Sequence, residues 1–434
     1  MAFEHIGMSK GHFTPPALAV GWATRWMNFR GLELHPKFLL TAILVLPATG
    51  VTESAPPAHA LSVMVRETAG IRRGNFPALA SVQIAQGQLR DAAHVRLLLE
   101  QQEIPVQASG ETRWPDGSIR QLGLNFNASI GPLAEQRYRL EFGDRVRPQP
   151  VQTDQLSVVE SADAWQVGKV RFGREPAALL QSVAFGREII GSGLNAFTVT
   201  AADGRDYPLA GEVAVEIVKP GPLAVQLRYA GSLQLAPDYS APFTITLDIP
   251  NTKSWVRYSA TVEDPALRIR AIGLHSSFAL GKFPWTWDFG TGSWSYGAFR
   301  NTTDSVVLRQ IAGARGVTDW QIATGPQGRE QLYERAAGRR PARVEGWGHL
   351  QDESRAVAFA IEDFGRVPGE HSISLDGNGQ LLFRFAPAEP ASRHTLSVYE
   401  HYVASPVPIG AATSPVAMSS PLVVSVEPGS PAAR

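Results

Sequence analysis

Cysteine is absent from this sequence of 434 residues, and only five residues are methionine. Without cysteine the protein has no disulfide framework, no thiol nucleophile and no zinc–thiolate site. The fold must therefore be held together by packing and hydrogen bonds. No EF-hand loop, phosphate-binding loop or dinucleotide fingerprint stands in a suitable context. We accordingly expect no metal ion and no cofactor.

Net charge is also absent, because 40 Lys and Arg residues balance 40 Asp and Glu residues. Composition therefore gives no electrostatic reason to expect a nucleic acid or an anionic membrane as a partner. The hydrophobic content of 44% and charged content of 18% are typical of a globular protein. The chain is long enough for two or three domains, each with its own core.

Hydrophobic runs are too short to span a bilayer. The apolar run 38–46 follows Lys37 and leads to small residues that end at Ala60. A charged flank, an apolar core and a small-residue site are typical of a secretory signal peptide. We expect residues 1–60 to be the signal region, with cleavage after Ala60, Met27 as a plausible true start and a periplasmic or secreted product. A membrane-retained anchor is the alternative reading.

Amphipathic helices are scarce, whereas period-2 alternation recurs. Phe243, Ile245, Leu247 and Ile249 alternate with polar residues, as expected for half-buried antiparallel strands. The best helix candidate is the short segment 327–337. The sequence therefore predicts an all-β fold.

A polar, proline-bearing stretch at 143–150 indicates a linker between two β domains. We expect a small domain at 61–145 and a large antiparallel β-sandwich at 151–403. Residues 404–434 are expected to form an edge strand, at 422–426, and a flexible tail.

The residue types at two positions explain why the chain should turn there. Pro115-Asp116-Gly117-Ser118 combines a fixed φ, a side chain that can bond its own backbone and a glycine that allows positive φ, so we expect a β-hairpin there. Trp114 beside it is expected to be a packing anchor. The segment 376–379, Asp-Gly-Asn-Gly, is better explained as a hairpin turn than as a calcium loop.

The order of several motifs resembles one known family. These motifs are Arg73-Gly74-Asn75-Phe76-Pro77, the 111–120 turn, Gln136–Gly143, Val215–Leu223, Ser254–Tyr258 with Val262–Pro265, and Gly346–His349. Together they are similar to the exo-rhamnogalacturonan lyase family, the YetA-like proteins. The resemblance implies an N-terminal RIFT-type β-barrel followed by a central β-sandwich, and a polysaccharide or oligosaccharide as partner. Relatives continue into an α/α toroid, so a separate toroid protein is an expected partner.

A lyase acting on acidic polysaccharide needs a group that neutralises the uronate carboxylate, a base and an acid. His349 and His275 are weak catalytic candidates, and a structural role is the alternative for each. Glycoside hydrolysis would instead need two carboxylates that face a sugar. The adjacent acids at 352–353 and 362–363 do not form such a pair if they lie on strands, because neighbours on a strand point to opposite faces. We expect them to be solvated loop residues.

Aromatic residues cluster at 283–297, where glycines favour a loop. One interpretation is a core plug or domain interface. The other is an aromatic platform for sugar rings. The substrate-binding candidates on that interpretation are Trp285, Trp287, Asp288, Trp294, Tyr296 and Arg300.

Two functions follow, with different chemistry. The first is an extracytoplasmic protein of the rhamnogalacturonan exolyase-like family that acts on or binds acidic polysaccharide, by β-elimination if it is an active lyase. The alternative is a non-catalytic carbohydrate-binding or scaffold β-protein without the toroid. A secreted structural β-protein that shares only the architecture is a third reading.

Overall fold

Side-chain alternation builds nearly all of this structure from strands. In β17 (Tyr239–Pro250), Phe243, Ile245 and Leu247 are buried, whereas Thr244 and Thr246 between them are half-buried. The computed structural model describes residues 59–150, 154–185, 188–191, 195–292, 295–312, 318–336, 344–403 and 417–428. The expected signal region before residue 59, including Met27, lies outside the described residues.

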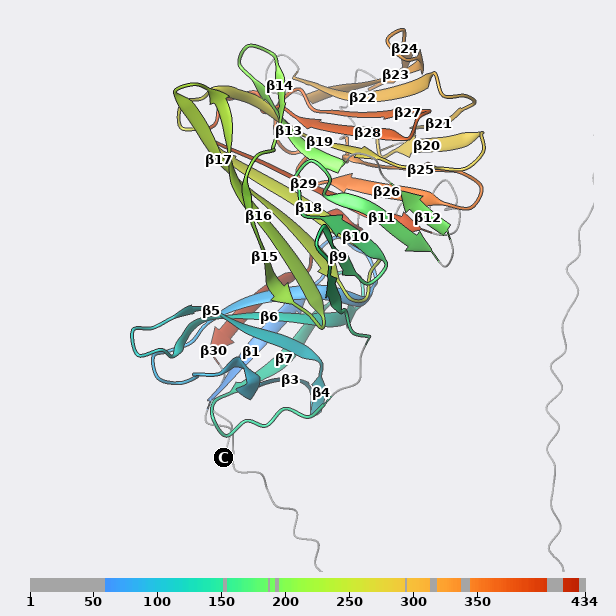
Figure 1. Cartoon of the computed structure of the whole chain (residues 1–434). Helices are drawn as coiled ribbons and strands as arrows, with labels where there is room; N and C mark the ends of the chain where they lie inside the picture. The colour runs from blue at the N-terminus through green and yellow to red at the C-terminus, as the bar shows by residue number, and fades with distance from the viewer. Residues whose placement is uncertain are drawn as a thin grey trace, which may run out of the picture. The chain divides into compact units, whose positions relative to one another are not determined.

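The N-terminal part is a small barrel-like pair of sheets around one core (Figure 1). The five-stranded sheet runs in the order β30 (Val423–Pro428), β1 (His59–Arg66), β7 (Glu135–Phe142), β3 (Val95–Leu99), β4 (Gln102–Ile104). The three-stranded sheet runs β2 (Arg73–Gln83), β6 (Ile119–Ile130), β5 (Val106–Arg113), and a 3-10 turn, η1 (Ala92–His94), precedes β3. Leu97, Leu122, Leu124 and Leu140 are among its fully buried residues.

The larger part is an antiparallel sandwich. Its nine-stranded sheet runs β15 (Val213–Pro220), β16 (Ala224–Ala236), β17, β18 (Trp255–Glu263), β29 (Arg393–Val403), β26 (Ala356–Ile361), β25 (Trp347–Gln351), β20 (Trp285–Phe289), β21 (Ser295–Phe299). Its eight-stranded sheet runs β14 (Asp206–Pro208), β13 (Asn195–Ala201), β19 (Ile269–Ser277), β28 (Gln380–Phe385), β27 (Ser372–Asp376), β22 (Asp304–Ala312), β23 (Thr318–Pro326), β24 (Gln331–Arg335). A further sheet runs β12 (Glu188–Gly191), β11 (Leu180–Phe185), β10 (Val170–Gly173), β9 (Ala164–Val167), β8 (Val158–Glu160). One large apolar cluster joins these sheets. The predicted all-β fold, a small barrel followed by a large sandwich, is confirmed.

The C-terminal strand returns to the N-terminal sheet. Figure 1 shows red β30 beside blue β1, and the two pair antiparallel from Leu61↔Pro428 to Arg66↔Val423. The expected edge strand near 422–426 is therefore present, and its neighbour is the first strand of the barrel. Residues 404–416 and 429–434 of the expected tail lie outside the described residues.

Residues 143–150 contain no strand. Among the described ladders, β1–β30 alone joins strands on opposite sides of this stretch. The domain boundary remains a prediction, and a test of it is given in the Discussion.

The predicted helix at 327–337 is wrong. Its central residues form β24, which pairs with β23 through Ala323↔Leu332 and Thr324↔Gln331. Gly328 has a φ of +76°, which bends the chain into a turn and interrupts a helical path. In the described part of the chain, no helix is long and apolar enough to cross a membrane.

Candidate functional site

The predicted aromatic platform is mostly buried. Trp285 and Trp287 in β20 are 5% and 1% exposed and belong to the sandwich core. The ring of Trp285 stacks on Phe283 at 4.4 Å between centroids, and the Trp287 ring meets Tyr333 edge-on at 5.8 Å. These rings offer no open face to a sugar, so the core-plug interpretation holds for them. The cause is the strand alternation, which turns both rings inward.

The other described candidates of the platform do not point toward a common site. Tyr296 is 54% exposed on the edge strand β21, and Arg300 is exposed just beyond it. Asp288 points to the other face of β20 from the two tryptophans and is buried. Trp294 lies outside the described residues.

Asp288 and His349 form a buried pair. They are directly opposite each other on β20 and β25, and Nδ1 of His349 lies 2.7 Å from Oδ1 of Asp288. Nε2 of His349 has no hydrogen-bond partner among the described residues. The structure thus brings together one catalytic candidate and one binding candidate. However, both side chains are almost fully enclosed, so a polysaccharide has no direct access to them.

His275 lies elsewhere. It belongs to β19 of the eight-stranded sheet, and its Nε2 lies 2.7 Å from Oε1 of Gln380. Its neighbour Leu274 is buried in the core, so His275 occupies the outer face of that sheet. The two histidine candidates are therefore on different sheets and form no common site.

One acid of each adjacent pair departs from the expectation of a solvated loop residue, whereas Glu353 and Asp363 are exposed in loops as expected. Asp352 is only 6% exposed and accepts hydrogen bonds from the backbone N–H groups of Ser354 and Arg355. Nε and Nη2 of Arg257 donate to Oε1 and Oε2 of Glu362, at 2.9 and 3.1 Å. The prediction failed for Glu362 because the sequence does not reveal a cation partner 105 residues away. For Asp352 the partner is local, since Arg355 lies three residues along the chain.

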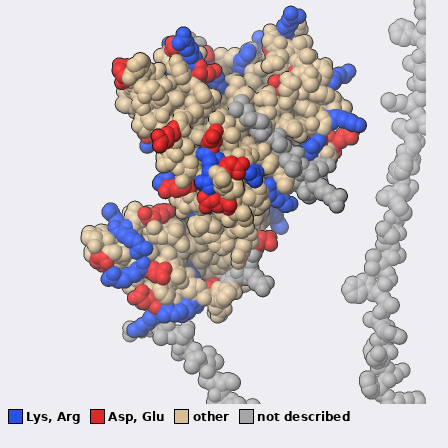
Figure 2. All heavy atoms as spheres, viewed as in Figure 1, with Lys and Arg blue, Asp and Glu red and all other residues tan. Residues whose placement is uncertain are grey.

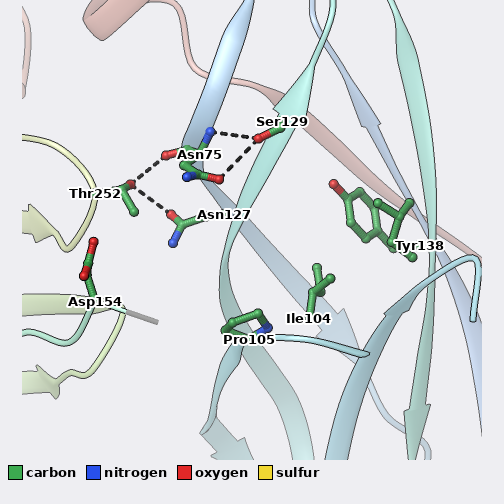
Figure 3. A pocket seen from close by; sticks show the side chains of 9 residues that line it. Asn75, Ile104, Pro105, Asn127, Ser129, Tyr138, Asp154 and Thr252 are labelled. Carbon is green, nitrogen blue, oxygen red and sulfur yellow. Dashed lines mark hydrogen bonds between the residues drawn. The ribbon is translucent and has the colours of Figure 1, made fainter. Parts of the chain in front are cut away.

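A polar pocket lies where the barrel contacts the sandwich (Figure 3). We call this cavity of about 640 Å³ the seam pocket, and it is lined by Asn75, Leu99, Ile104, Pro105, Asn127, Ser129, Tyr138, Asp154 and Thr252. Its volume is within the range of small-ligand sites. Hydroxyl, amide and carboxylate groups make up its polar lining, and no lining residue is Arg, Lys or His.

A bulge in β2 shapes one wall of the seam pocket. The β2–β6 register shifts between Arg73 and Phe76, and Asn75 adopts a φ of +43°, a left-handed conformation that asparagine tolerates. The Asn75 N–H donates to Oγ of Ser129 at 2.9 Å, and Oγ of Thr252 donates to the Asn75 carbonyl at 2.6 Å (Figure 3). Bulges of this kind often re-aim side chains beside binding sites.

The sandwich loop at 250–254 fixes the opposite wall. Nδ2 of Asn127 donates to Oδ1 of Asn251 at 3.0 Å, and Nζ of Lys253 donates to the carbonyl of Gly74 at 2.8 Å. Asp154 is exposed, and no described hydrogen bond engages its side chain, so its carboxylate is available to a ligand. Hydrogen bonds thus fix two walls of the pocket, and the Asp154 carboxylate is a free acceptor.

Sequence reasoning missed this site, although a signal was present. Asn125, Asn127 and Ser129 form a polar row in a strand whose alternate residues are apolar. Such a row indicates a face that contacts polar groups, but the sequence does not say which ones. In the described part of the chain, no three His, Cys, Asp or Glu side chains gather in a way that could hold a metal ion.

No protein-family model matches this sequence, and no curated protein matches it. Solved structures do share its fold. An α-mannosidase from Enterococcus faecalis V583 aligns with a TM-score of 0.53 and 12% identity over 86% of this chain and 46% of that chain. A glycosyl hydrolase family 38 protein from Enterococcus faecalis aligns with a TM-score of 0.53 and 10% identity over 85% and 48%. A putative aldose 1-epimerase from Escherichia coli K12 covers 57% of this chain with a TM-score of 0.32.

At such low identity the two alignments with TM-scores of 0.53 establish a shared fold and nothing more. The present chain spans less than half the length of each of those two proteins.

Proposed function

We propose that this protein is an extracytoplasmic carbohydrate-binding β-protein that takes up sugar units in the seam pocket. The observation that carries the proposal is the pocket's lining of hydroxyl, amide and carboxylate groups, fixed in place by hydrogen bonds between barrel and sandwich. The sequence resemblance to exo-rhamnogalacturonan lyases and the fold shared with an α-mannosidase and a glycosyl hydrolase family 38 protein both favour a carbohydrate ligand.

The lining of the seam pocket favours binding over β-elimination. A lyase needs a cation or a strong donor set to neutralise the uronate carboxylate, and a base to take the α-proton. None of the lining residues is basic, and the charged member, Asp154, would repel a uronate. We therefore favour the non-catalytic alternative at this site.

The same charge argument suggests which part of a glycan enters. Uncharged sugar units present only hydroxyls and ring oxygens, which match the amides and hydroxyls of the pocket. Rhamnogalacturonan alternates uncharged rhamnose with galacturonate, so it can place an uncharged unit there, whereas polygalacturonate cannot. Figure 2 shows acidic and basic side chains interspersed on the visible face, which forms no single-sign track for a polyanion.

A polysaccharide panel tests the proposal. The protein without residues 1–58 is run in native gels that contain rhamnogalacturonan, polygalacturonate, galactan or mannan, and each reaction is followed for the ultraviolet absorbance of an unsaturated uronate. We expect retardation by rhamnogalacturonan, none by polygalacturonate and no absorbance increase. Failure to bind any polysaccharide overturns the proposal, and an unsaturated product would show that the protein is a lyase.

A further inference from the structure

A second cavity lies between the barrel and the outer face of the nine-stranded sheet. This cavity of about 390 Å³, which we call the Arg257 pocket, is within the size range of small-ligand sites. One wall is apolar and includes Leu79, Trp255 and Leu422. Leu79 is 59% exposed at its rim, so its side chain presents apolar surface there. This wall can cover the apolar edge of a ligand.

The other wall is a row of polar side chains across neighbouring strands. Gln226, Asp248, Arg257 and Tyr399 are directly opposite one another on β16, β17, β18 and β29. Nη1 of Arg257 donates to Oδ2 of Asp248 at 3.3 Å, and its other nitrogens hold Glu362. Nε2 of Gln226 donates to Oδ1 of Asp248 at 2.6 Å, and the Tyr399 hydroxyl donates to Oε1 of Glu362 at 2.8 Å, so hydrogen bonds fix the side chains of this row.

The two carboxylates retain acceptor capacity toward the cavity. Side chains of Asp248 and Glu362 are each 28% exposed, although both are bonded to Arg257. A carboxylate oxygen has two acceptor sites. Oδ2 of Asp248 accepts from Nη1 of Arg257, and Oε2 of Glu362 accepts from Nη2 of Arg257, so each of these oxygens has room for a ligand hydroxyl. Oε1 of Glu362 already accepts from Nε of Arg257 and from the hydroxyl of Tyr399. Burial would raise the pKa of Glu362, but the hydrogen bonds and charge of Arg257 hold it below its usual value. Glu362 therefore acts as an acceptor at neutral pH.

The charges of this pocket cancel. Lys219 and Arg257 contribute two positive charges, and Asp248 and Glu362 contribute two negative ones. A uronate would have to compete with both carboxylates for Arg257, and a cation would meet Arg257 and Lys219. An uncharged ligand meets neither penalty.

We propose that the Arg257 pocket is a second saccharide site that takes an uncharged pyranose ring, with its hydroxyls on Asp248 and Glu362 and its apolar edge on Leu79 and Trp255. This inference rests on the proposed function and extends it to a second position on the protein. Asn125 lines this pocket, and Asn127 lines the seam pocket. Two residues along a strand span roughly 7 Å, so the two sites are close enough for one oligosaccharide to reach both.

Ligand-observed NMR titrations with methyl glycosides test this site. The probes are the methyl glycosides of a 6-deoxyhexose, of the corresponding hexose and of a hexuronic acid. We expect the 6-deoxyhexoside to bind best and the hexuronate worst. Asp248→Asn should weaken the 6-deoxyhexoside about tenfold, because a charged acceptor is lost. Leu79→Gln should weaken it by a similar factor.

Matched controls separate a binding role from a structural one. Glu216→Gln alters another ion pair on the same sheet, with Arg228, and Leu332→Gln alters a leucine that is 58% exposed on β24. Neither control residue lines either pocket, and both variants should bind like the wild type. All four variants should melt within a few degrees of the wild type. If Leu79→Gln melts lower, Leu79→Ser replaces it.

The outcomes distinguish the two sites. Wild-type affinity in Asp248→Asn and Leu79→Gln, or preference for the hexuronate, overturns the second site. If Asp154→Asn abolishes binding in that same experiment, the seam pocket stands alone. If binding depends on Asp248 and Leu79 but not on Asp154, the second site stands and the seam pocket is excluded. Absence of binding by any glycoside overturns both.

Discussion

Two buried glutamates, Glu67 and Glu400, show that the neighbouring groups decide how costly a buried carboxylate is. The carboxylate of Glu67 in the barrel accepts a hydrogen bond from Nη2 of Arg73 at 2.9 Å. It also accepts from the backbone N–H groups of Gly70 and Leu133 at 2.8 and 3.0 Å. Glu400 in the sandwich has no cation partner among the described residues and receives only hydroxyl groups, from Ser276 and Tyr402. A buried carboxylate without a cation is costly, whereas a paired one is stable.

Glu400 should make the protein less stable as the pH rises. Burial raises its pKa to about 7, although Ser276 and Tyr402 lower it in part. Since the folded state holds the proton more tightly than the unfolded state, this contribution to stability is complete below about pH 4.5. It is then lost as the pH rises through about 7, a change of about 3 kcal/mol.

The Glu400→Gln variant removes this titration. Urea unfolding of wild type and variant at about pH 4.5 and about pH 8.5 measures it, and the stability difference should shift by about 3 kcal/mol in favour of the variant at the higher pH. A constant difference across that range would show that Glu400 does not titrate with a raised pKa.

Arg73 should be among the most sensitive residues of the barrel. Its pair with Glu67 is fully buried, and Arg73 also donates to the carbonyl of Ala417 at 2.7 Å. Arg73→Met leaves the Glu67 carboxylate buried without its cation, which costs about 3–5 kcal/mol. Arg66→Met, which alters the exposed pair with Glu135, should cost less than about 1 kcal/mol in the same chemical denaturation experiment. Equal losses for the two variants would contradict this reading.

At the scale of elements, local turn chemistry was predictable. Gly117 has a φ of +82°, and Oδ1 of Asp116 accepts hydrogen bonds from the backbone and side chain of Ser118. The Asp376–Gly379 segment likewise joins β27 to β28 as a hairpin turn. These features depend on a few adjacent residues, and the sequence contains all the information that determines them.

Trp114 packs less completely than the sequence suggests. Its ring is half-buried, its Nε1 donates to the carbonyl of Ile84 at 3.0 Å, and the guanidinium of Arg120 lies 5.0 Å from its ring centre. Trp114→Ala should therefore cost about 1–3 kcal/mol, below the range for a fully buried tryptophan. Thermal unfolding measures this, with no effect on saccharide binding, because Trp114 lines neither pocket. A binding loss without a stability loss would reassign it to a ligand site.

At the scale of the whole molecule, the contacts that create the sites join distant segments. The Thr252–Asn75 bond spans 177 residues, and Arg257 meets Glu362 across 105 residues. Alternation of residues predicts which face a side chain occupies, but not which sheet will lie against that face. The fold class was therefore readable from the sequence, whereas both pockets were not. For the same reason, the sequence did not predict that β30 pairs with β1.

The C-terminal strand should hold the two parts of the chain together after a cut in the linker. Arg145 is exposed in the 143–150 stretch and offers trypsin a site there, whereas Arg147 precedes Pro148, and trypsin does not cleave an Arg–Pro bond. We expect limited trypsin treatment to give two fragments on a denaturing gel that still elute as one particle in gel filtration, because β30 remains paired with β1. Fragments that separate under native conditions, or resistance of the stretch to cleavage, would contradict this arrangement.

The predicted export signal implies a position for the start of the mature chain. We propose cleavage after Ala60, which would leave Leu61 as the first residue and β1 with six of its residues. His59, which the cut would remove, stacks on Phe142 at 5.4 Å between ring centres. N-terminal sequencing of periplasmic or secreted protein decides the matter, and an uncleaved chain found in the cytosol would rule out this assignment.

The most direct test of carbohydrate binding in the seam pocket is calorimetric titration of wild type and Asp154→Asn with a rhamnogalacturonan oligosaccharide. Asp144→Asn is the matched control, because Asp144 is also an exposed loop carboxylate and lines neither pocket. We predict at least about a tenfold loss of affinity in Asp154→Asn, the loss expected for one charged acceptor, with wild-type affinity in Asp144→Asn and equal melting temperatures. Equal affinities for all three proteins, or no heat of binding for the wild type, would contradict the proposal.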